Sequence, residues 1–596
     1  MAAEYVVSTP TTVTNGGVGN PDGNDSFTVT STGSIATTIF GTSIAANGNM
    51  NIISNAGTVS ASSPLSYGIY QLGDNNNIFN TGTINAPFGI NVDGIGNKID
   101  NSGVITVIGS GAGGAGIFAL STVGTVGNIV NNSGTINSAV NNSAGIFVNS
   151  PATAGKNIVN NSGVIRLTGG NNKAIYVVGE NEINNIGEIY ALGANSNVFE
   201  TDNSSWGTIF TNSGKLISIE GKAVLFGASD SQLSLLAPSF IAGAIDMGAF
   251  NNVLDITSGR SQSNSWFITG TPIAVNRLGL LPSAWTGIQY ATIDPTALSA
   301  SANLVADLTS GVSEIVRNNS EGGEWWLKSF GSYSEYGASG IYNDYADFNA
   351  GIVGGASTQI NADFYVGAML GYGISNLSVN SKWEISQTIN SKGVLGALYA
   401  KSQFDNFYAD FSIFGGLMGN DSSRLVNDNT EFMGIDHAIA NYNSWFITPE
   451  LRIGADIATD SEWAISPRAM IRYTSQAIDG YIETGSNANA TIGARTVQVL
   501  EGNVELAAST ALENGTLTLA SGIDYRQAIG ENQAVTLLGQ NITLAQNTAN
   551  TTIGYVSADV SYELGGGANL DLSARAAFGT NNHKSIAGSV GISGKF

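Results

Sequence analysis

Few side chains in this sequence could carry catalysis. Cysteine is absent, and the two histidines, His437 and His583, both lie in the second half of the chain. A Ser-His-Asp triad within the first half is therefore impossible, and zinc would lack its usual ligands. The sequence contains no GxSxG, HExxH or GGxGxD string, which are signatures of hydrolases, zinc proteases and calcium-binding repeats. We expect no enzyme, no cofactor and no dedicated metal site, although scattered acids leave weak divalent-cation binding open.

The composition points to a membrane protein without a membrane-spanning helix. Of 596 residues only 11% are charged and the mean hydropathy is +0.08, whereas soluble proteins average about a quarter charged. No run of 18 apolar residues occurs, and a β-barrel accounts for both facts because its lipid-facing residues alternate with polar ones. The net charge of -23 argues against a nucleic-acid partner.

From residue 324 onward the sequence alternates with a period of two. Stretches such as Phe364–Ile374, Val556–Leu564 and Leu570–Phe578 place apolar residues on one face, as in a barrel with a polar lumen. We predict 12 such strands, with Ala534–Leu544 as either a strand or a folded loop; a soluble β-sandwich is the alternative. The inward positions carry charges that we expect to form ion pairs supporting the barrel and its contents, rather than a transport site: Arg468, Arg472, Asp524, Arg526, Asp559 and Arg575.

A single amphipathic helix precedes the strands. Asp294 is a good N-cap and Pro295 a good first residue, and the pattern predicts a helix to Arg317, about 34 Å long at 1.5 Å per residue. Its polar opposite face excludes contact with lipid, so we expect it in the barrel lumen; packing on a soluble domain is the alternative. Asn318 and Asn319 follow it and suit helix C-capping. The apolar face comprises Leu298, Ala302, Val305, Leu308, Val312 and Ile315.

The first half of the chain is a repeat. Strings such as NIVNNSGTIN from Asn128 and NIVNNSGVIR from Asn157 recur every 21 to 31 residues, alternating with a second motif such as YGIY from Tyr67. Each unit buries its apolar residues only when stacked, so the pattern predicts a right-handed parallel β-helix with Asn side chains stacked in amide ladders. Within the first string we expect Ile129 and Ile136 to point inward. A disordered low-complexity linker is the alternative.

The repeats end in a predicted cap. Residues 233–259 read as the last coils, and the exposed end of such a stack needs covering. We expect the cap from four aromatic residues, Trp266, Phe267, Trp285 and Tyr290. The predicted protein is thus all-β, with repeats at 1–232, final coils and capping junction at 233–294, the lumen helix at 295–320 and the membrane barrel at 321–596.

In this order of parts the chain resembles monomeric autotransporters of type V secretion. The likeness is carried by IDMGAFNNVLDI, ATIDPTALSASANLVADL, EWWLKSFGSYSEYG and the ending GSVGISGKF, and it covers nearly the whole chain. The resemblance implies a barrel inserted in the outer membrane by the barrel-assembly machinery, with periplasmic chaperones and with Phe596 as the tag that is read. It also implies a repeat domain, the passenger, that crosses through or beside the barrel and folds outside.

The resemblance raises one possible reaction. Some family members release the passenger when an Asn side chain attacks the next peptide bond inside the barrel. Here Asn318 and Asn319 lie close to Glu324, at the rim instead of mid-lumen, so we favour the C-capping role.

We therefore expect a monomeric autotransporter whose passenger is adhesin-like or structural and meets a ligand on a host or neighbouring cell. The alternatives are a passenger with an unfamiliar enzymatic site and a pore with an extracellular domain. An outer-membrane protein needs an export signal, and the start MAAEY has neither a basic nor an apolar region. We expect the signal peptide to have been removed from this numbering.

Overall fold

The computed structural model describes residues 3–13, 22–38, 41–109, 113–152, 154–227, 230–249, 251–260, 262–317, 324–458, 462–530, 532–547 and 549–595. The chain forms two compact units. The first, the solenoid unit, comprises Met1–Leu280, Trp285–Ala291 and Asn427–Asp436; the second, the barrel unit, comprises Leu281–Ala284, Thr292–Val426 and His437–Phe596. The prediction of a parallel β-helix followed by an antiparallel barrel is confirmed.

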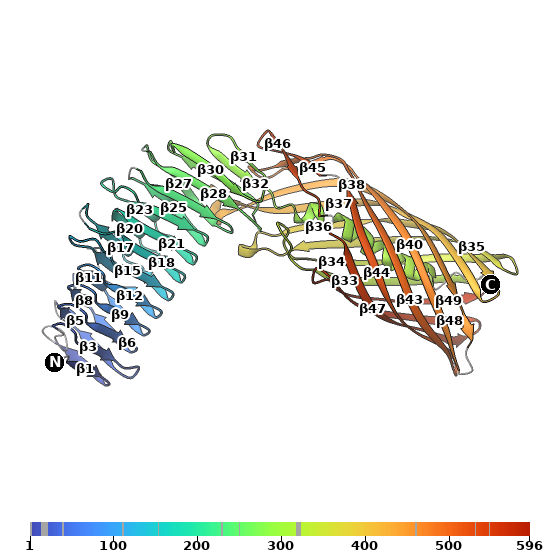
Figure 1. Cartoon of the computed structure of the whole chain (residues 1–596), viewed down its shortest axis with the longest axis horizontal. Helices are drawn as coiled ribbons and strands as arrows, with labels where there is room; N and C mark the ends of the chain where they lie inside the picture. The colour runs from blue at the N-terminus through green and yellow to red at the C-terminus, as the bar shows by residue number, and fades with distance from the viewer. Residues whose placement is uncertain are drawn as a thin grey trace. The chain divides into compact units, whose positions relative to one another are not determined.

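Most of the described solenoid coils contain three short strands (Figure 1). In one coil these are β15 (Ile129–Asn132), β16 (Thr135–Ser138) and β17 (Ser143–Ser150). They pair in parallel and in register with β18 (Asn157–Asn161), β19 (Val164–Leu167) and β20 (Lys173–Gly179) of the next coil. The first sequence motif therefore spans two strands and the turn between them, and the second motif is the third strand.

The remaining strands continue these three faces. The first face adds β1 (Glu4–Val7), β3 (Ser26–Val29), β6 (Ile52–Asn55), β9 (Asn77–Asn80), β12 (Lys98–Asn101), β21 (Asn181–Asn185), β24 (Ile209–Asn212), β26 (Gln232–Leu236), β28 (Val253–Ser258) and β30 (Ala274–Gly279). The second adds β2 (Pro10–Val13), β4 (Ser34–Thr37), β7 (Thr58–Ala61), β10 (Thr83–Ala86), β13 (Val104–Val107) and β22 (Glu188–Ala191). The third adds β5 (Thr42–Asn47), β8 (Tyr67–Leu72), β11 (Phe88–Asp93), β14 (Gly114–Leu120) and β23 (Asn197–Thr201). Two longer strands, β25 (Lys215–Phe226) and β27 (Phe240–Asp246), continue both the second and the third face, and β29 (Asn264–Thr269), β31 (Ser283–Trp285) and β32 (Gln289–Thr292) follow them.

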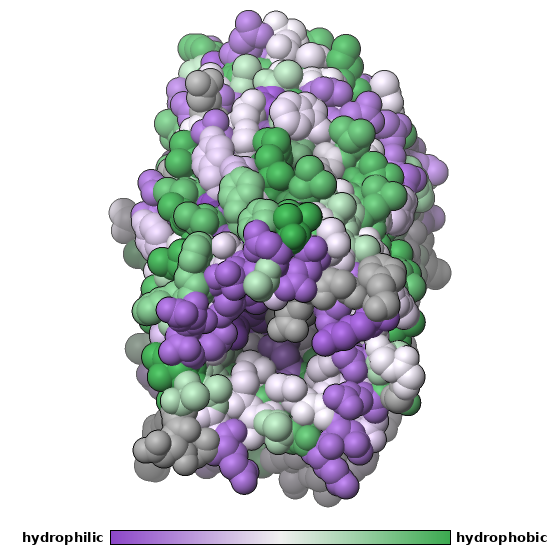
Figure 2. Space-filling view, turned by 90° about the vertical axis from the view of Figure 1, so that its right-hand side faces the viewer, coloured by the Kyte–Doolittle hydropathy of each residue, from purple (hydrophilic) through white to green (hydrophobic). Residues whose placement is uncertain are grey.

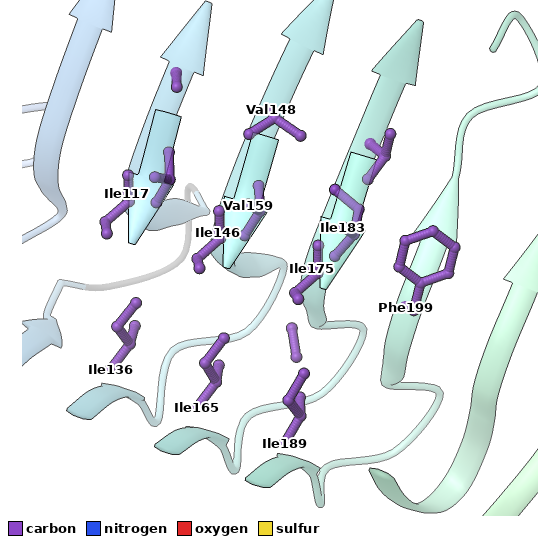
Figure 3. Close-up of a cluster of buried hydrophobic side chains, with 14 of the residues drawn as sticks. Ile117, Ile136, Ile146, Val148, Val159, Ile165, Ile175, Ile183, Ile189 and Phe199 are labelled. Atoms are coloured by element: carbon purple, nitrogen blue, oxygen red, sulfur yellow. The ribbon is translucent and has the colours of Figure 1, made fainter. Parts of the chain in front are cut away.

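The solenoid core is a stack of equivalent aliphatic side chains. Ile136 and Ile165 occupy successive rungs of the second face, and Ile117, Ile146 and Ile175 occupy those of the third (Figure 3). All five are fully buried. The expectation for Ile129 was wrong: Val130 is buried at this strand and Ile129 is 37% exposed. Since Asn132 must point inward to join a ladder, the alternation of the strand turns Val130 inward and Ile129 outward.

The predicted amide ladders are present. At one corner, seven Asn side chains are linked along the stack by Nδ2–H···Oδ1 hydrogen bonds of 2.7–2.8 Å, running Asn55, Asn80, Asn101, Asn132, Asn161, Asn185 and Asn212. At another corner the carboxamide of one coil accepts a backbone N–H of the preceding coil, as from Asn76 to Asn97 at 2.9 Å. The ladders satisfy polar groups that the turns bury.

The last coils are closed by aromatic packing. Trp266 and Tyr290 are fully buried and stack with ring centroids 5.8 Å apart. Trp285 packs partly buried against the same core. Phe267 donates its backbone N–H to the Asn429 carboxamide at 2.7 Å, so the segment 427–436 also belongs to this end of the solenoid unit.

The barrel is a closed antiparallel sheet of 12 long strands. These are β33 (Glu324–Tyr336), β34 (Tyr345–Asn361), β35 (Phe364–Val379), β36 (Gln387–Phe404), β37 (Phe407–Asp428), β38 (Ile435–Ala455), β40 (Trp463–Ile478), β43 (Arg495–Leu512), β44 (Gly515–Gly530), β47 (Thr551–Gly565), β48 (Ala568–Gly579) and β49 (Lys584–Lys595). The first strand pairs with the last, from Glu324 opposite Lys595 to Glu335 opposite Lys584. A two-residue strand, β39 (Ile457–Ala458), pairs with β40, and short 3-10 turns lie at η1 (Lys382–Glu384) and η2 (Phe432–Gly434).

The alternation separates an apolar outside from a polar inside. Leu370, Leu398 and Leu417 are among the most exposed residues of the barrel, whereas the inward positions hold the charged residues described below. Figure 2, which faces the end of the barrel where the C terminus lies, shows hydrophilic residues gathered around a hollow and hydrophobic residues spread over the flanks. Ala534–Leu544 is a folded loop, because β45 (Gln533–Leu537) and β46 (Gln540–Leu544) join β41 (Tyr481–Ile482) and β42 (Ala490–Ile492) in a separate four-stranded sheet.

The predicted helix is present but interrupted. It consists of α1 (Thr296–Ser299) and α2 (Ser301–Arg317). Ser301 donates its hydroxyl to the Leu298 carbonyl at 3.1 Å, and such a local bond competes with regular helix bonding. Within the described residues, no helix has the length and apolar character that crossing a membrane requires.

Candidate functional site

The helix lies inside the barrel, because its side chains bond strands all around the wall. Asn303 donates to the Tyr345 hydroxyl of β34 at 2.6 Å, Ser313 donates to Glu450 of β38 at 2.6 Å, and Asp307 pairs with Arg526 of β44 at 2.9 Å. A helix packed on the outer wall could reach only neighbouring strands. Figure 1 shows the helix running within the barrel.

The apolar face of the helix packs against one side of the lumen. Val305, Leu308, Val312 and Ile315 are buried, whereas Leu298 is half-buried. Val305 and Leu308 face Ile389 of β36, Met418 of β37 and Phe446 of β38 across a space of about 40 Å³. The helix therefore fills this side nearly to the wall.

The predicted inward charges form a connected network with the helix. Arg472 pairs with Glu501 at 2.8 Å and with Glu450 at 3.4 Å, and also donates to the Ser310 hydroxyl and the Thr309 carbonyl. Arg526 joins Glu501 at 3.0 Å to Asp307 of the helix. Because these side chains are at most 8% exposed, the pairing offsets a large desolvation cost.

The other predicted charges are also paired. Arg468 bonds Glu505 at 3.0 Å, Arg575 pairs with Asp524, and Asp559 lies 3.7 Å from Arg317 of the helix. Arg317 in turn donates to both carboxylate oxygens of Glu505 at 3.2 Å. The last turn of the helix is thus held by β43 and β47.

Sequence reasoning predicted Asp524 and Asp559 but missed three glutamates of this network. Glu450 lies on β38, and Glu501 and Glu505 lie on β43. Their positions carried a signal, because Glu501 and Glu505 are four residues apart on one strand and so face the same side. Arg317 was assigned to the helix end without a partner.

The lumen is asymmetric. On the side opposite the apolar face, a cavity of about 80 Å³ separates the helix from the strands that close the barrel. It is lined largely by small residues, among them Gly311, Ser332, Ser573, Ala587 and Ser589. Most ion pairs and hydrogen bonds of the helix go to β38, β40, β43 and β44, while between Gly311 and the closing strands the lumen is loosely filled.

The start of the helix is held separately. Asp294 accepts the Thr296 N–H at 2.9 Å, as its predicted capping role requires, and also accepts from the Asn343 carboxamide. Gln387 donates to the Asp294 carbonyl at 3.1 Å. Asn318, Asn319 and Phe596 lie outside the described residues, so the reaction and tag considered for them stay predictions.

A second point of interest is the segment 427–436, which runs from the end of β37 to the start of β38 but packs in the solenoid unit. The Asn427 carboxamide bonds both the N–H and the carbonyl of Ile241, at 2.9 and 2.8 Å, and accepts from the Trp266 indole at 2.8 Å. Asn429 likewise accepts the Phe267 N–H at 2.7 Å and donates to its carbonyl at 2.8 Å. The two side chains thereby imitate the backbone pairing of a strand along β27 and β29.

The barrel unit is thus a sheet closed by its own terminal strands around a helix. Residues 325–582 match the family model described as Autotransporter beta-domain. Together with the parallel solenoid before it, this match supports an autotransporter with a β-helical passenger and an outer-membrane location.

The chain is also similar to individual proteins. It is 22% identical over 370 residues to Outer membrane protein B of Rickettsia japonica, a match that covers 58% of this chain and 21% of that relative. The chain thus spans about a fifth of the length of that curated relative. Among solved structures, the translocator domain of the autotransporter NalP from Neisseria meningitidis is 17% identical with a TM-score of 0.42, covering 51% of this chain and all of that one. The β-domain of the Bordetella autotransporter BrkA is 17% identical with a TM-score of 0.36, covering 46% of this chain and all of that one.

Proposed function

We propose that the barrel supports export of its own passenger and holds it on the cell surface, and that the passenger is an adhesin-like or structural module and not an enzyme. The barrel inserts with the help of the barrel-assembly machinery and periplasmic chaperones, and the protein acts as a monomer. The observation that carries the proposal is the helix, which follows the solenoid in sequence, lies in the lumen and is bonded to strands on several sides. A helix left inside the lumen is the expected state of the chain after its passenger has been exported.

An adhesive role for the passenger is supported by an aromatic stripe on the third face of the solenoid. We define it as the outward residues Tyr67, Tyr70, Phe88, Phe118, Phe147 and Tyr176. Phe147 lies between Phe118 and Tyr176, with ring centroids 4.6 and 4.9 Å away. All six side chains are half-buried on the outer surface of the coils, and aromatic residues are enriched at protein interfaces.

Two tests separate this proposal from its alternatives. Cells displaying the intact chain should bind host or neighbouring cells, and the passenger should be cleaved by protease added outside. Replacing Phe118, Phe147 and Tyr176 with serine should reduce binding several-fold without altering display. The matched control replaces the outward residues Thr135 and Asn137 of the second face with alanine. Equal binding by both variants would show that the stripe is not the adhesive surface.

The role of Phe596 as an assembly tag is tested at the membrane. Removing Phe596 should slow insertion in cells but hardly change the stability of barrels refolded in detergent. Removing all of β49 should abolish both, because β33 would lose its partner and expose unpaired backbone to lipid. Normal insertion without Phe596 would leave β49 with a role in closure alone.

A further inference from the structure

Two loops of the barrel unit build a small sheet at the end of the barrel opposite the C terminus (Figure 1). The loop after β40 supplies β41 and β42, and the loop after β44 supplies β45 and β46. Each loop pairs within itself as a hairpin. The two hairpins are joined by three residue pairs, namely Ala490 with Leu537, Thr491 with Thr536 and Ile492 with Val535.

This sheet is packed like a protein interior. Its apolar residues Ala490, Ile492, Val535, Leu537 and Leu544 are all buried. Tyr481 stacks face to face on Tyr442 of β38, with ring centroids 4.2 Å apart. Such packing indicates a defined structure and not two loose loops.

A buried ion pair ties the sheet to the barrel wall. Arg424 of β37 donates to Glu483 at 3.0 Å, and both side chains are 4% exposed. Arg424 also donates to the Ala488 carbonyl at 2.8 Å, and Glu483 accepts the Ala490 N–H at 2.8 Å. The pair thus fixes the first hairpin in one position over β37.

The second loop and the strand that follows the first loop also hold the start of the helix. Arg495 of β43 donates to the Ser301 hydroxyl at 3.1 Å, and the N–H of Asn547 in the second loop donates to the Ser299 hydroxyl at 2.9 Å. Asn343 and Gln387 hold Asp294, just before the helix. The cavity left beside Ser299 and Asn547 is about 20 Å³, which is the size of a single water molecule.

We propose that the four-stranded sheet is a lid, open while the passenger is exported and closed on the helix start afterwards. The inference rests on the proposed export function. A mouth that encloses one helix this tightly has no room for a second segment of chain. Opening would separate the hairpins at their three residue pairs and release their bonds to β37 and to the helix start, while each hairpin stays intact. The lid then seals the mouth from outside, independently of the ion pairs deeper in the lumen.

A disulfide between the hairpins tests the proposal. The chain has no cysteine, so Thr491→Cys with Thr536→Cys introduces a single possible bond. Antiparallel partners lie about 4.5–5.5 Å apart at Cα, which suits a disulfide. Cells making this variant under reducing conditions are pulse-labelled and oxidised either before or after the passenger becomes accessible to external protease.

We expect oxidation after export to form the disulfide without changing passenger exposure. Oxidation before export should either form no disulfide or leave the bonded chains with a passenger that external protease cannot reach. The lid is refuted if chains bonded early expose the passenger at the rate of the single Thr491→Cys variant, or if late oxidation forms no bond. The matched control, Ala534→Cys with Thr543→Cys, bonds partners within one hairpin and should not delay export. Failure of the single-cysteine variants to expose any passenger would instead contradict the export function.

A second variant tests whether the ion pair between Arg424 and Glu483 holds the lid closed. Glu483→Gln removes the charge that pairs with Arg424 but keeps a similar shape. In displayed Thr491→Cys, Thr536→Cys protein, this change should slow disulfide formation several-fold while leaving display unchanged. An unchanged rate would show that the ion pair does not hold the lid closed.

Discussion

The solenoid and the barrel solve the same problem, that of burying polar groups, in different ways. The solenoid repeats one solution, an uncharged Asn at an equivalent corner of each coil, so that every carboxamide bonds the next. The barrel uses ionised pairs that each occur once, such as Arg526 between Asp307 and Glu501. A repeated geometry permits a repeated side chain, whereas a lumen that holds one helix needs individual bonds to each strand.

This contrast predicts where damage spreads. In the solenoid each coil contacts mainly its neighbours, so a local change should stay local. In the barrel, ion pairs such as Asp307 with Arg526 and Arg317 with Glu505 join the helix to the wall, so a change in this network should loosen the helix as a whole. The predictions below test this difference, beginning with the largest expected effect.

Deleting Pro295–Asn319 should convert a closed barrel into an open one. The wall strands close on each other without the helix, so the barrel should still insert. Its polar lumen would then fill with water and conduct ions. Conductance of single proteins in planar bilayers measures this, with the intact chain as control. If the barrel without Pro295–Asn319 conducts no ions, the helix does not block the lumen. That result would also give no support to the pore alternative.

Replacing Arg472 with methionine should destabilise the barrel by about 3–5 kcal/mol, because Glu501 and Glu450 would lose a buried partner. The loss should appear as a lower unfolding temperature in detergent and as transient channel openings. The control is Lys392→Met, which removes an exposed pair in which Lys392 is 64% and Asp421 54% exposed. We expect at most about 0.5 kcal/mol from that change. Equal effects would mean that the lumen network does not hold the helix.

Replacing Ile136 with aspartate should cost the solenoid at least about 3 kcal/mol, since it buries a charge without a partner. Protease sensitivity should rise between residues 103 and 163 while the distant coils stay protected. Ile129→Asp is the matched control in the same coil, because Ile129 faces outward. Unchanged protection in the Ile136 variant would refute the stacked-coil arrangement, and loss of protection along the whole solenoid would refute its modular character.

The outcome for Ile129 shows how far periodicity reaches. The repeat defined the coils and located Ile136 correctly. Ile136 lies between two polar residues, so the alternation of the strand leaves only this side chain for the interior. In Ile129–Val130 two apolar residues are adjacent, and the facing was decided by Asn132, whose ladder appears only when coils are stacked. The placement of 427–436 likewise depends on contacts between segments far apart in sequence.

The lumen charges show the same limit. Alternation along β40, β44 and β48 was enough to turn Arg472, Arg526 and Arg575 inward. Their partners are set by strand register and by rotation of the helix, neither of which is encoded locally. The four-stranded sheet of the lid was equally out of reach, because its central pairing joins Thr491 to Thr536 across two intervening barrel strands.

Replacing Asn132 with alanine should cost about 1–3 kcal/mol, because the carboxamides of Asn101 and Asn161 would each lose a buried hydrogen bond. Thermal unfolding of the passenger measures it. The control is Asn131→Ala on the adjacent outward row. The hydrogen bonds of Asn131 with Asp100 and Asn160 are only partly buried, so this change should cost less. A cost for Asn131 as large as for Asn132 would show that burial is not what gives the inner ladder its value.

The smallest expected effect concerns pH and the outer surface of the solenoid. The hydroxyl and the N–H of Ser204 donate to Asp202 at 2.6 and 2.8 Å and, with the Tyr176 hydroxyl at 2.9 Å, lower the pKa of this carboxyl below its usual 3.8. A carboxyl with a lowered pKa in the folded state stabilises that state above its unfolded pKa, and the contribution is lost as pH falls through the folded pKa. Because Asp202 is partly solvated, the contribution should be below about 1 kcal/mol. The free energy of unfolding is measured for wild type and Asp202→Asn between pH 6 and about pH 2. It should fall more steeply in wild type as the pH drops below the usual pKa of an Asp carboxyl. Parallel curves would mean that the outward hydrogen bonds of this rung add nothing, and that solenoid stability comes from its interior alone.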